Sequence, residues 1–264
     1  MSPQQHIKLC IILLATSVAL EITLLAGVAG ISAVLYHGLH IALIAALAAS
    51  QFAVFFSGRK VGAVSRAALW FAVGLCFCGV GDFINGAVST VQPVSLKLSW
   101  ALLLFGAGYA LYDLALWTFA GALLVQQGGA MARYRYWLAV PVPVLLINVV
   151  SWVQHVQGNV QGFALLYYGS FIFNATIYVM MPTFAAWYFF STRQSVGSLV
   201  VLVGALLIPY SDLILFGSWL HGGNPAVPDF QLYAFNWILY FGGQVLISLF
   251  PSLLLEQVKN RATA

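Results

Sequence analysis

The sequence predicts an all-α fold, a polytopic bundle of eight transmembrane helices with both termini in the cytoplasm. Three observations lead to this prediction. First, 62% of the 264 residues are hydrophobic and only 6% are charged, whereas soluble domains contain about 25% charged residues. Second, the apolar runs reach the roughly 20 residues that a membrane-spanning helix needs, and they are continuous, unlike the alternating strands of a membrane β-barrel. Third, the basic residues divide unevenly between the two ends of these runs.

The apolar runs define the expected elements in chain order. The boundary between the first two is marked only by Gly27 and Gly30, but the stretch between Lys8 and Arg59 is long enough to require two crossings. No segment outside the runs is long enough for a soluble domain, so residues 1–264 are expected to form a single transmembrane domain. The approximate spans are 9–29, 33–56, 67–88, 98–124, 137–156, 162–190, 198–220 and 231–255.

The basic residues support this number of spans. With eight spans and a cytoplasmic N-terminus, only Lys97 lies outside, as the positive-inside rule expects, whereas seven or nine spans would mix the charges. The net charge of +4 is thus a topology signal, and no nucleic-acid partner is predicted. Short termini and tight loops favour a bacterial inner (cytoplasmic) membrane. The basic residues assigned to the cytoplasmic side are Lys8, Arg59, Lys60, Arg66, Arg133, Arg135, Arg193, Lys259 and Arg261.

Two acidic residues, Asp82 and Asp212, lie inside long apolar runs of a chain that has only six acids. An ionisable side chain at the centre of a membrane helix costs at least about 2.5–3.5 kcal/mol, so it marks a functional site by default. Burial favours the protonated form of a carboxyl group, and a protonated carboxyl group can act as a general acid. We therefore expect Asp82 and Asp212 to be functional, although both could instead simply bond to neighbouring helices.

The two aspartates are expected at a similar depth in the bilayer. Asp82 follows Arg66 by about 16 residues, and Asp212 follows Arg193 by about 19, which at about 1.5 Å per residue gives roughly 24 and 28 Å. Helical rise places further polar side chains in the same band, toward the outer half of the bilayer. The candidates for binding or orienting a substrate are Tyr109, Tyr112, Asp113, Asn85, Asn174 and Gln244.

Three other polar residues have less defined roles. Glu21 interrupts the first span and is either structural or peripheral. His37 and His40 are spaced i, i+3 near a helix end. This spacing can bind a metal or haem, but without a partner cluster we expect an interfacial role instead. The sequence therefore predicts no metal site and no cofactor.

Four segments, in order, resemble the YhhN family of membrane proteins, which includes the lysoplasmalogenases. The resemblance covers roughly residues 60–255. Asp82 and Asp212 align with the catalytic aspartates proposed for the family, and Tyr112 and Gln244 also match. Tyr109 and Gly243 depart from it, since the family usually has His and Ala there, and Asp113 has no counterpart. The segments are WFAVGLCFCGVGDFIN, WALLLFGAGYALYDLALW, GALLIPYSDLILF and LYFGGQVLISL.

The resemblance implies an integral membrane hydrolase that cleaves the vinyl ether bond of lysoplasmalogens. The products would be a fatty aldehyde and glycerophosphoethanolamine or glycerophosphocholine. One aspartic acid would protonate the vinyl ether and the other would act as the carboxylate, and the sequence does not distinguish them. The substrate would enter from the surrounding membrane lipids, with its headgroup near the interface. The tryptophans expected to mark that interface are Trp100, Trp152, Trp219 and Trp237.

Two other classes of function remain open at the level of the sequence. One is a proton-coupled membrane transporter that uses Asp82, Asp113 and Asp212 as a relay, because chains of intramembrane acids are typical of proton pathways. The other is a lipid-binding or assembly protein in which the aspartates only hold helices together. A hydrolase releases product in detergent without a gradient, whereas a transporter needs a pH gradient across a closed membrane.

Overall fold

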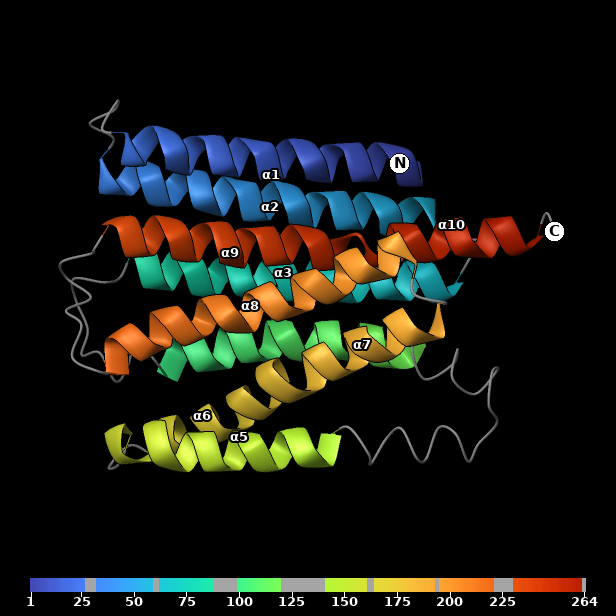
Figure 1. The fold of residues 1–264 in the computed structure, drawn as a ribbon. Helices are drawn as coiled ribbons and strands as arrows, with labels where there is room; N and C mark the ends of the chain where they lie inside the picture. Colours follow the sequence, from blue (N-terminus) through green and yellow to red (C-terminus); the bar gives the residue numbers. More distant parts are fainter. Residues whose placement is uncertain are drawn as a thin grey trace.

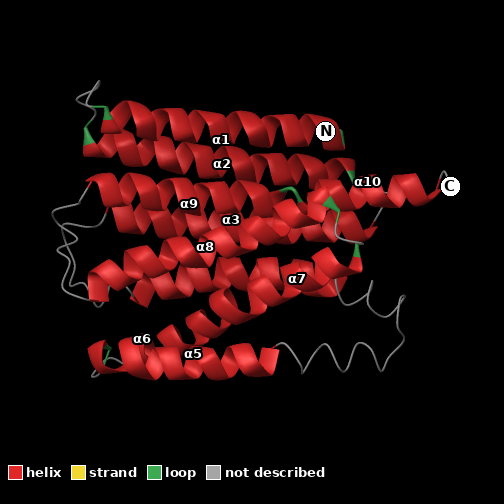
Figure 2. Cartoon of the chain, in the orientation of Figure 1, coloured by secondary structure: helices red, strands yellow, loops and turns green. Residues whose placement is uncertain are grey.

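The computed structural model describes residues 1–26, 32–58, 62–87, 99–119, 141–160, 164–192, 195–220 and 230–262. These residues form helices and no β-strand (Figure 2). The helices lie side by side as a bundle, and the N- and C-terminal marks lie at the same end of it (Figure 1). The all-helical bundle predicted from the sequence is confirmed.

The helices follow the predicted order. The segment Ala164–Ser191 is one continuous helix with a π-helical turn, Ala175–Met180, between α6 and α7. A short 3₁₀ turn, Gln157–Asn159, follows α5. The remaining bounds are α1 Pro3–Leu25, α2 Ala33–Ser57, α3 Gly62–Ala87, the helix Ser99–Phe119, α5 Pro141–His155, α6 Ala164–Asn174, α7 Met181–Ser191, α8 Val196–Leu220, α9 Phe230–Ser248 and α10 Phe250–Ala262.

Seven helices in the described part of the chain are long and apolar enough to cross a membrane. They coincide with seven of the eight predicted spans. The remaining prediction, 137–156, coincides with α5, which has 15 residues, and its first residues, 137–140, lie outside the described part. Large apolar side chains such as Ile11, Phe56 and Leu213 are more than half exposed on the bundle surface, as expected for helices that face lipid.

Local sequence explains where α1 begins. The Ser2 hydroxyl accepts a hydrogen bond from the Gln5 backbone N–H at 3.2 Å, and the Gln5 side chain accepts one from the Ser2 N–H at 2.8 Å. This reciprocal pair is a capping box, which satisfies backbone donors that a helix start leaves free. Pro3 occupies the first turn, where its missing N–H costs nothing.

Glycines allow two pairs of helices to approach until their backbones touch. A Cβ on Gly74 would lie 2.8 Å from the Gly108 carbonyl oxygen, and one on Gly108 would lie 2.8 Å from that of Gly74. A Cβ on Gly204 would lie 2.9 Å from the Gly243 carbonyl oxygen, and the reverse distance is 3.0 Å. The first contact joins α3 to the Ser99–Phe119 helix, and the second joins α8 to α9. Small residues that permit such contacts are typical of helix association in membranes.

Candidate functional site

Asp82 and Asp212 line the same pocket inside the bundle. The pocket has a volume of about 80 Å³, which exceeds the roughly 10–15 Å³ that one water needs. It is formed by the start of α2, the end of α3, the start of the Ser99–Phe119 helix, the C-terminal half of α8 and the start of α9, so it lies toward the end of the bundle opposite both termini. The lining residues are Tyr36, His37, His40, Ile41, Asp82, Asn85, Phe105, Asp212, Leu215, Tyr233, Asn236, Trp237 and Tyr240.

The two aspartates have different surroundings. Asp82 is partly exposed to the pocket, and its Oδ2 accepts a hydrogen bond of 3.0 Å from the hydroxyl of Tyr240 on α9. Asp212 is only 5% exposed, and its Oδ2 has no hydrogen-bond partner among the described residues. One carboxyl group is thus held in place, while the other presents a buried oxygen without a partner.

A second set of contacts lies one helical turn below the Asp82–Tyr240 pair. The Tyr112 hydroxyl donates to Gln244 Oε1 at 2.7 Å, and Gln244 Nε2 lies 3.8 Å from the Cys78 sulfur. Cys78 precedes Asp82 by four residues, and Gln244 follows Tyr240 by four, so each pair lies on one helix face. The structure therefore brings the predicted residues Tyr112 and Gln244 together beneath the pocket, where they connect three helices.

Tyr109 is fully buried and lies close to Asp212. Its hydroxyl has no hydrogen-bond partner among the described residues. Its ring stacks against Phe105, which lines the pocket, with centroids 6.1 Å apart. Tyr109 is thus close enough to Asp212 to act on its carboxyl group.

The remaining predicted residues divide into those inside and those outside the pocket. Asn85 lines it. Asp113 is 2% exposed and does not line it, and neither of its carboxyl oxygens has a partner among the described residues. Asn174 lies where α6 meets the π-helical turn, also outside the lining. The structure thus groups Asn85 with the aspartate pair, but not Asp113 or Asn174.

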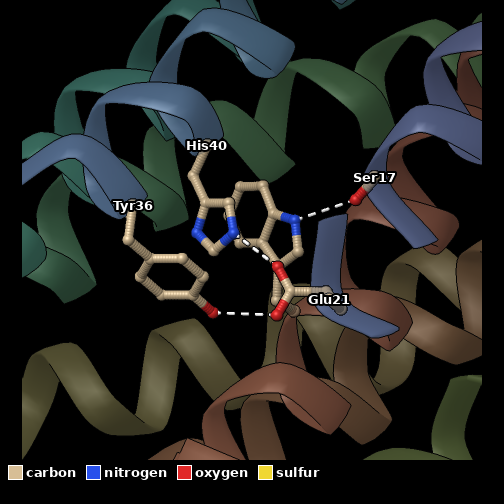
Figure 3. Close-up of polar contacts among 5 residues, drawn as sticks. Ser17, Glu21, Tyr36 and His40 are labelled. Atoms are coloured by element: carbon tan, nitrogen blue, oxygen red, sulfur yellow. Dashed lines mark hydrogen bonds and ion pairs between the residues drawn. The ribbon is translucent and has the colours of Figure 1, made fainter. Parts of the chain in front are cut away.

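A polar cluster that the sequence does not assign to the site borders the same pocket, and Figure 3 shows its contacts. Glu21 on α1 is fully buried, and its carboxyl group accepts hydrogen bonds from the Tyr36 hydroxyl at 3.0 Å and from His40 Nε2 at 2.6 Å. The His40 ring stacks on Trp237, with centroids 3.7 Å apart. Three members of this cluster line the pocket: Tyr36, His40 and Trp237.

The cluster adds to what the sequence indicated. His40 is 5% exposed and bonded to Glu21, so both side chains lie inside the bundle and Glu21 is not peripheral. Trp237 is 7% exposed inside the bundle, because its indole N–H donates to Ser17 at 2.9 Å and its face packs on His40. The i, i+4 spacing of Tyr36 and His40, opposite an acid in the preceding span, is the signal that could have identified the cluster.

The charge of the pocket determines what it can bind. Its described lining holds two carboxyl groups, borders a third, and contains no lysine or arginine. Two carboxyl groups in one site seldom ionise together, so one can hold a proton while the other is a carboxylate. Within the described residues no group of three His, Cys, Asp or Glu side chains could hold a metal. The arrangement is that of a proton donor and a proton acceptor facing a small, partly aromatic cavity.

No protein family, curated protein or solved structure with which the chain was compared matches it.

Proposed function

We propose that the chain is an integral membrane hydrolase of the YhhN type, which cleaves the vinyl ether bond of lysoplasmalogens. The observation that supports this most strongly is the presence of Asp82 and Asp212, which lie 130 residues apart in the sequence, in one pocket. A pair of carboxyl groups can divide the roles of acid and base, as in glycoside hydrolysis. The proposal combines this geometry with the resemblance of the four sequence segments.

The reaction requires one proton donor and one negatively charged group. One aspartic acid gives its proton to the β-carbon of the vinyl ether, which forms an oxocarbenium ion. The other aspartate stabilises that cation while water adds to the carbon next to oxygen, giving a hemiacetal. The hemiacetal then collapses to a fatty aldehyde and a free glycerol hydroxyl on the glycerophospho-headgroup. The Tyr240–Asp82 hydrogen bond and the partner-free oxygen of Asp212 favour Asp82 as the carboxylate and Asp212 as the acid, because a hydrogen bond donated to a carboxylate stabilises its charged form.

The surroundings of the pocket suit a lipid substrate. Apolar side chains cover the exposed faces of the helices, so a single acyl-like chain can remain in hydrocarbon while its vinyl ether reaches the pocket. The pocket lies toward one end of the bundle rather than at its middle, which leaves the headgroup near the membrane surface. The partners in this proposal are the lysophospholipid substrate and the membrane lipids.

We further propose eight passes, with both termini in the cytoplasm of a bacterial cell and the pocket in the outer half of the inner membrane. The position of both termini at one end of the bundle supports an even number of passes (Figure 1). In this arrangement α5, with 15 described residues, is the core of the fifth pass, which completes the eight. The distribution of basic residues supports the cytoplasmic assignment.

Aldehyde release from a lysoplasmalogen by the purified protein in detergent tests the hydrolase proposal. We expect release by the parent protein, and a decrease of about 10²–10⁴-fold in Asp82→Asn and in Asp212→Asn, the range typical of a lost acid or base. Asp113→Asn is the matched control, because Asp113 is a buried acid outside the pocket lining. No release by folded parent protein, with either choline or ethanolamine headgroups, would rule out the hydrolase.

The same variants separate the hydrolase from the transporter. A relay through three acids predicts that Asp113→Asn is as damaging as Asp82→Asn, and that function requires a pH gradient. The absence of Asp113 from the pocket lining favours the hydrolase. Uptake by proteoliposomes that depends on a gradient and is lost in all three variants would instead establish transport.

A further inference from the structure

We propose that Glu21 positions His40 as a third proton-transfer group of the aspartate pocket. This inference rests on the proposed function for its substrate, but its geometry stands independently. Three contacts fix the imidazole. They are the 2.6 Å bond to Glu21, the stacking on Trp237 with an interplanar angle of 4°, and an edge-on contact with the Tyr36 ring, whose centroid lies 4.1 Å from that of His40. His40 is thus held on three sides, and it also lines the aspartate pocket.

The bond to Glu21 determines which nitrogen of His40 carries a proton. When Glu21 is ionised it can only accept hydrogen bonds, and His40 Nε2 then donates to it and holds the N–H. In the neutral ring, Nδ1 then has a free lone pair, on the side of the ring away from Glu21 (Figure 3). Within the described residues the contacts of His40 are the bond to Glu21 and the ring contacts with Tyr36 and Trp237, which leaves Nδ1 to take a proton from a molecule in the pocket that His40 lines.

Glu21 also stabilises the charged state that follows. When Nδ1 takes a proton the ring becomes a cation, and the buried carboxylate 2.6 Å away balances that charge. The Tyr36 hydroxyl, which donates to the other Glu21 oxygen at 3.0 Å, keeps the carboxylate oriented. A carboxylate that holds a histidine in one tautomer and balances its charge is the arrangement by which enzymes make histidine an efficient base.

In the proposed reaction, His40 acts after the first proton transfer. The aspartic acid gives its proton to the β-carbon and becomes a carboxylate. Water then bonds to the oxocarbenium carbon, and the proton that this water loses goes to His40 Nδ1. His40 returns the proton to the ether oxygen as the C–O bond breaks, while the hemiacetal hydroxyl proton passes to the first aspartate. Aldehyde and alcohol leave, and all three side chains are restored to their starting states.

His40→Gln and Glu21→Gln test this role, and His6→Gln is the matched control. His6 is also a fully buried histidine that bonds to neighbouring helices, through Ser50, Gln51 and Ser252, but it does not line the pocket. We expect kcat for aldehyde release to fall by about 10²-fold in His40→Gln, within the range for a lost acid–base group, with KM little changed. His6→Gln should retain the parent kcat.

Glu21→Gln distinguishes positioning from simple support, because it preserves shape but removes the charge that balances His40. We expect a smaller loss of kcat than in His40→Gln, together with a changed dependence of kcat on pH. The titratable groups that bond to His40 or line the pocket with it, and so shape that dependence, are Glu21 on α1, Tyr36 and His37 on α2, Asp82 on α3, Asp212 on α8, and Tyr233 and Tyr240 on α9. If His40→Gln does not fold, Glu21→Gln, which keeps the shape of the side chain, provides the test.

Two results would overturn the proposal. One is a kcat of folded His40→Gln within about threefold of the parent value, since general acid–base groups contribute far more. The other is a loss of kcat in His6→Gln as large as that in His40→Gln. A ¹⁵N spectrum of histidine-labelled protein provides a readout without substrate, in which Glu21→Gln should change the His40 signals and His6→Gln should not. If the parent releases no aldehyde, the hydrolase and the catalytic step fail together. The spectrum then decides alone whether Glu21 fixes the His40 tautomer.

Discussion

The hydrogen bond between Asp82 and Tyr240 shows how one residue of this bundle depends on another far away in the chain. The two side chains are 158 residues apart in sequence and 3.0 Å apart in space. The phenol O–H stabilises the charged form of the Asp82 carboxyl group and fixes its rotamer. It should therefore influence both the protonation state of Asp82 and the direction in which its carboxyl group points.

Replacement of Tyr240 by Phe removes this hydrogen bond while keeping the ring. A hydrogen bond to a charged group contributes about 1.5–3 kcal/mol, so we expect kcat for aldehyde release to fall by roughly tenfold or more, since about 1.4 kcal/mol corresponds to a factor of ten. Tyr210→Phe is the control, because Tyr210 on α8 is 53% exposed and outside the pocket lining. Equal activity of the two variants would remove Tyr240 from the site.

The sequence predicted some residues of the pocket and missed others for a physical reason. Asp82 and Asp212 were predictable because a carboxyl group within hydrocarbon is costly wherever it faces. Glu21 and His40 were not assigned, because their spans are apolar on all sides and give no indication of which face is internal. The aromatic residues Trp237 and Tyr240 cost far less in lipid than an acid does, so only the packed helices reveal that they line the pocket.

Among the helices, the glycine contacts determine how closely the two aspartate-bearing elements approach their partners. Gly74 and Gly204 each precede an aspartate, Asp82 or Asp212, by eight residues. On both α3 and α8 a backbone contact therefore lies about two turns, or roughly 12 Å, from the carboxyl group. These contacts lock α3 to the Ser99–Phe119 helix and α8 to α9, so that the pocket walls are held at a fixed spacing.

Substitution of Gly204 by Ala tests this role. The new Cβ would lie 2.6 Å from the Ile247 backbone nitrogen and 2.9 Å from the Gly243 carbonyl oxygen, and neither backbone can move aside easily. We expect a loss of about 1–3 kcal/mol, typical of overpacking, seen as earlier thermal unfolding in detergent. Gly38→Ala is the control, since no atom lies within 4 Å of its added Cβ. Equal stability of the two variants would contradict a tight α8–α9 contact.

At the scale of the whole molecule, the sequence predicted the all-helical bundle and the location of seven long apolar helices. The length and continuity of apolar runs determine both, because a spanning helix must cross about 30 Å of hydrocarbon. The sequence did not predict how the spans pack around a common pocket, since this depends on contacts between residues far apart in the chain. The π-helical turn at Ala175–Met180 was also not predicted, because Pro182 alone does not specify it.

The proposed topology can be tested with reporters fused to each terminus. With eight passes and cytoplasmic ends, a fluorescent-protein fusion should be bright at both termini, and a fusion to a phosphatase that works only outside the cytoplasm should be inactive at both. The uneven distribution of Lys and Arg is the physical reason. Opposite results at the two termini would exclude eight passes.

The distance along the chain between Asp82 and Tyr240 also has a consequence for biosynthesis. At about 5–20 residues per second, the ribosome makes Tyr240 roughly 8–32 s after Asp82, given their separation of 158 residues. Throughout that interval α3 must remain in the bilayer with its acid not yet paired. Its cost of about 2.5–3.5 kcal/mol has to be offset by the apolar residues of α3 alone, at roughly 0.3–0.6 kcal/mol for each Leu, Ile, Phe or Val. The hydrophobicity of α3 is therefore a requirement of insertion as well as of the finished bundle, and removal of several of its lipid-facing apolar residues would stop assembly before the pocket could form.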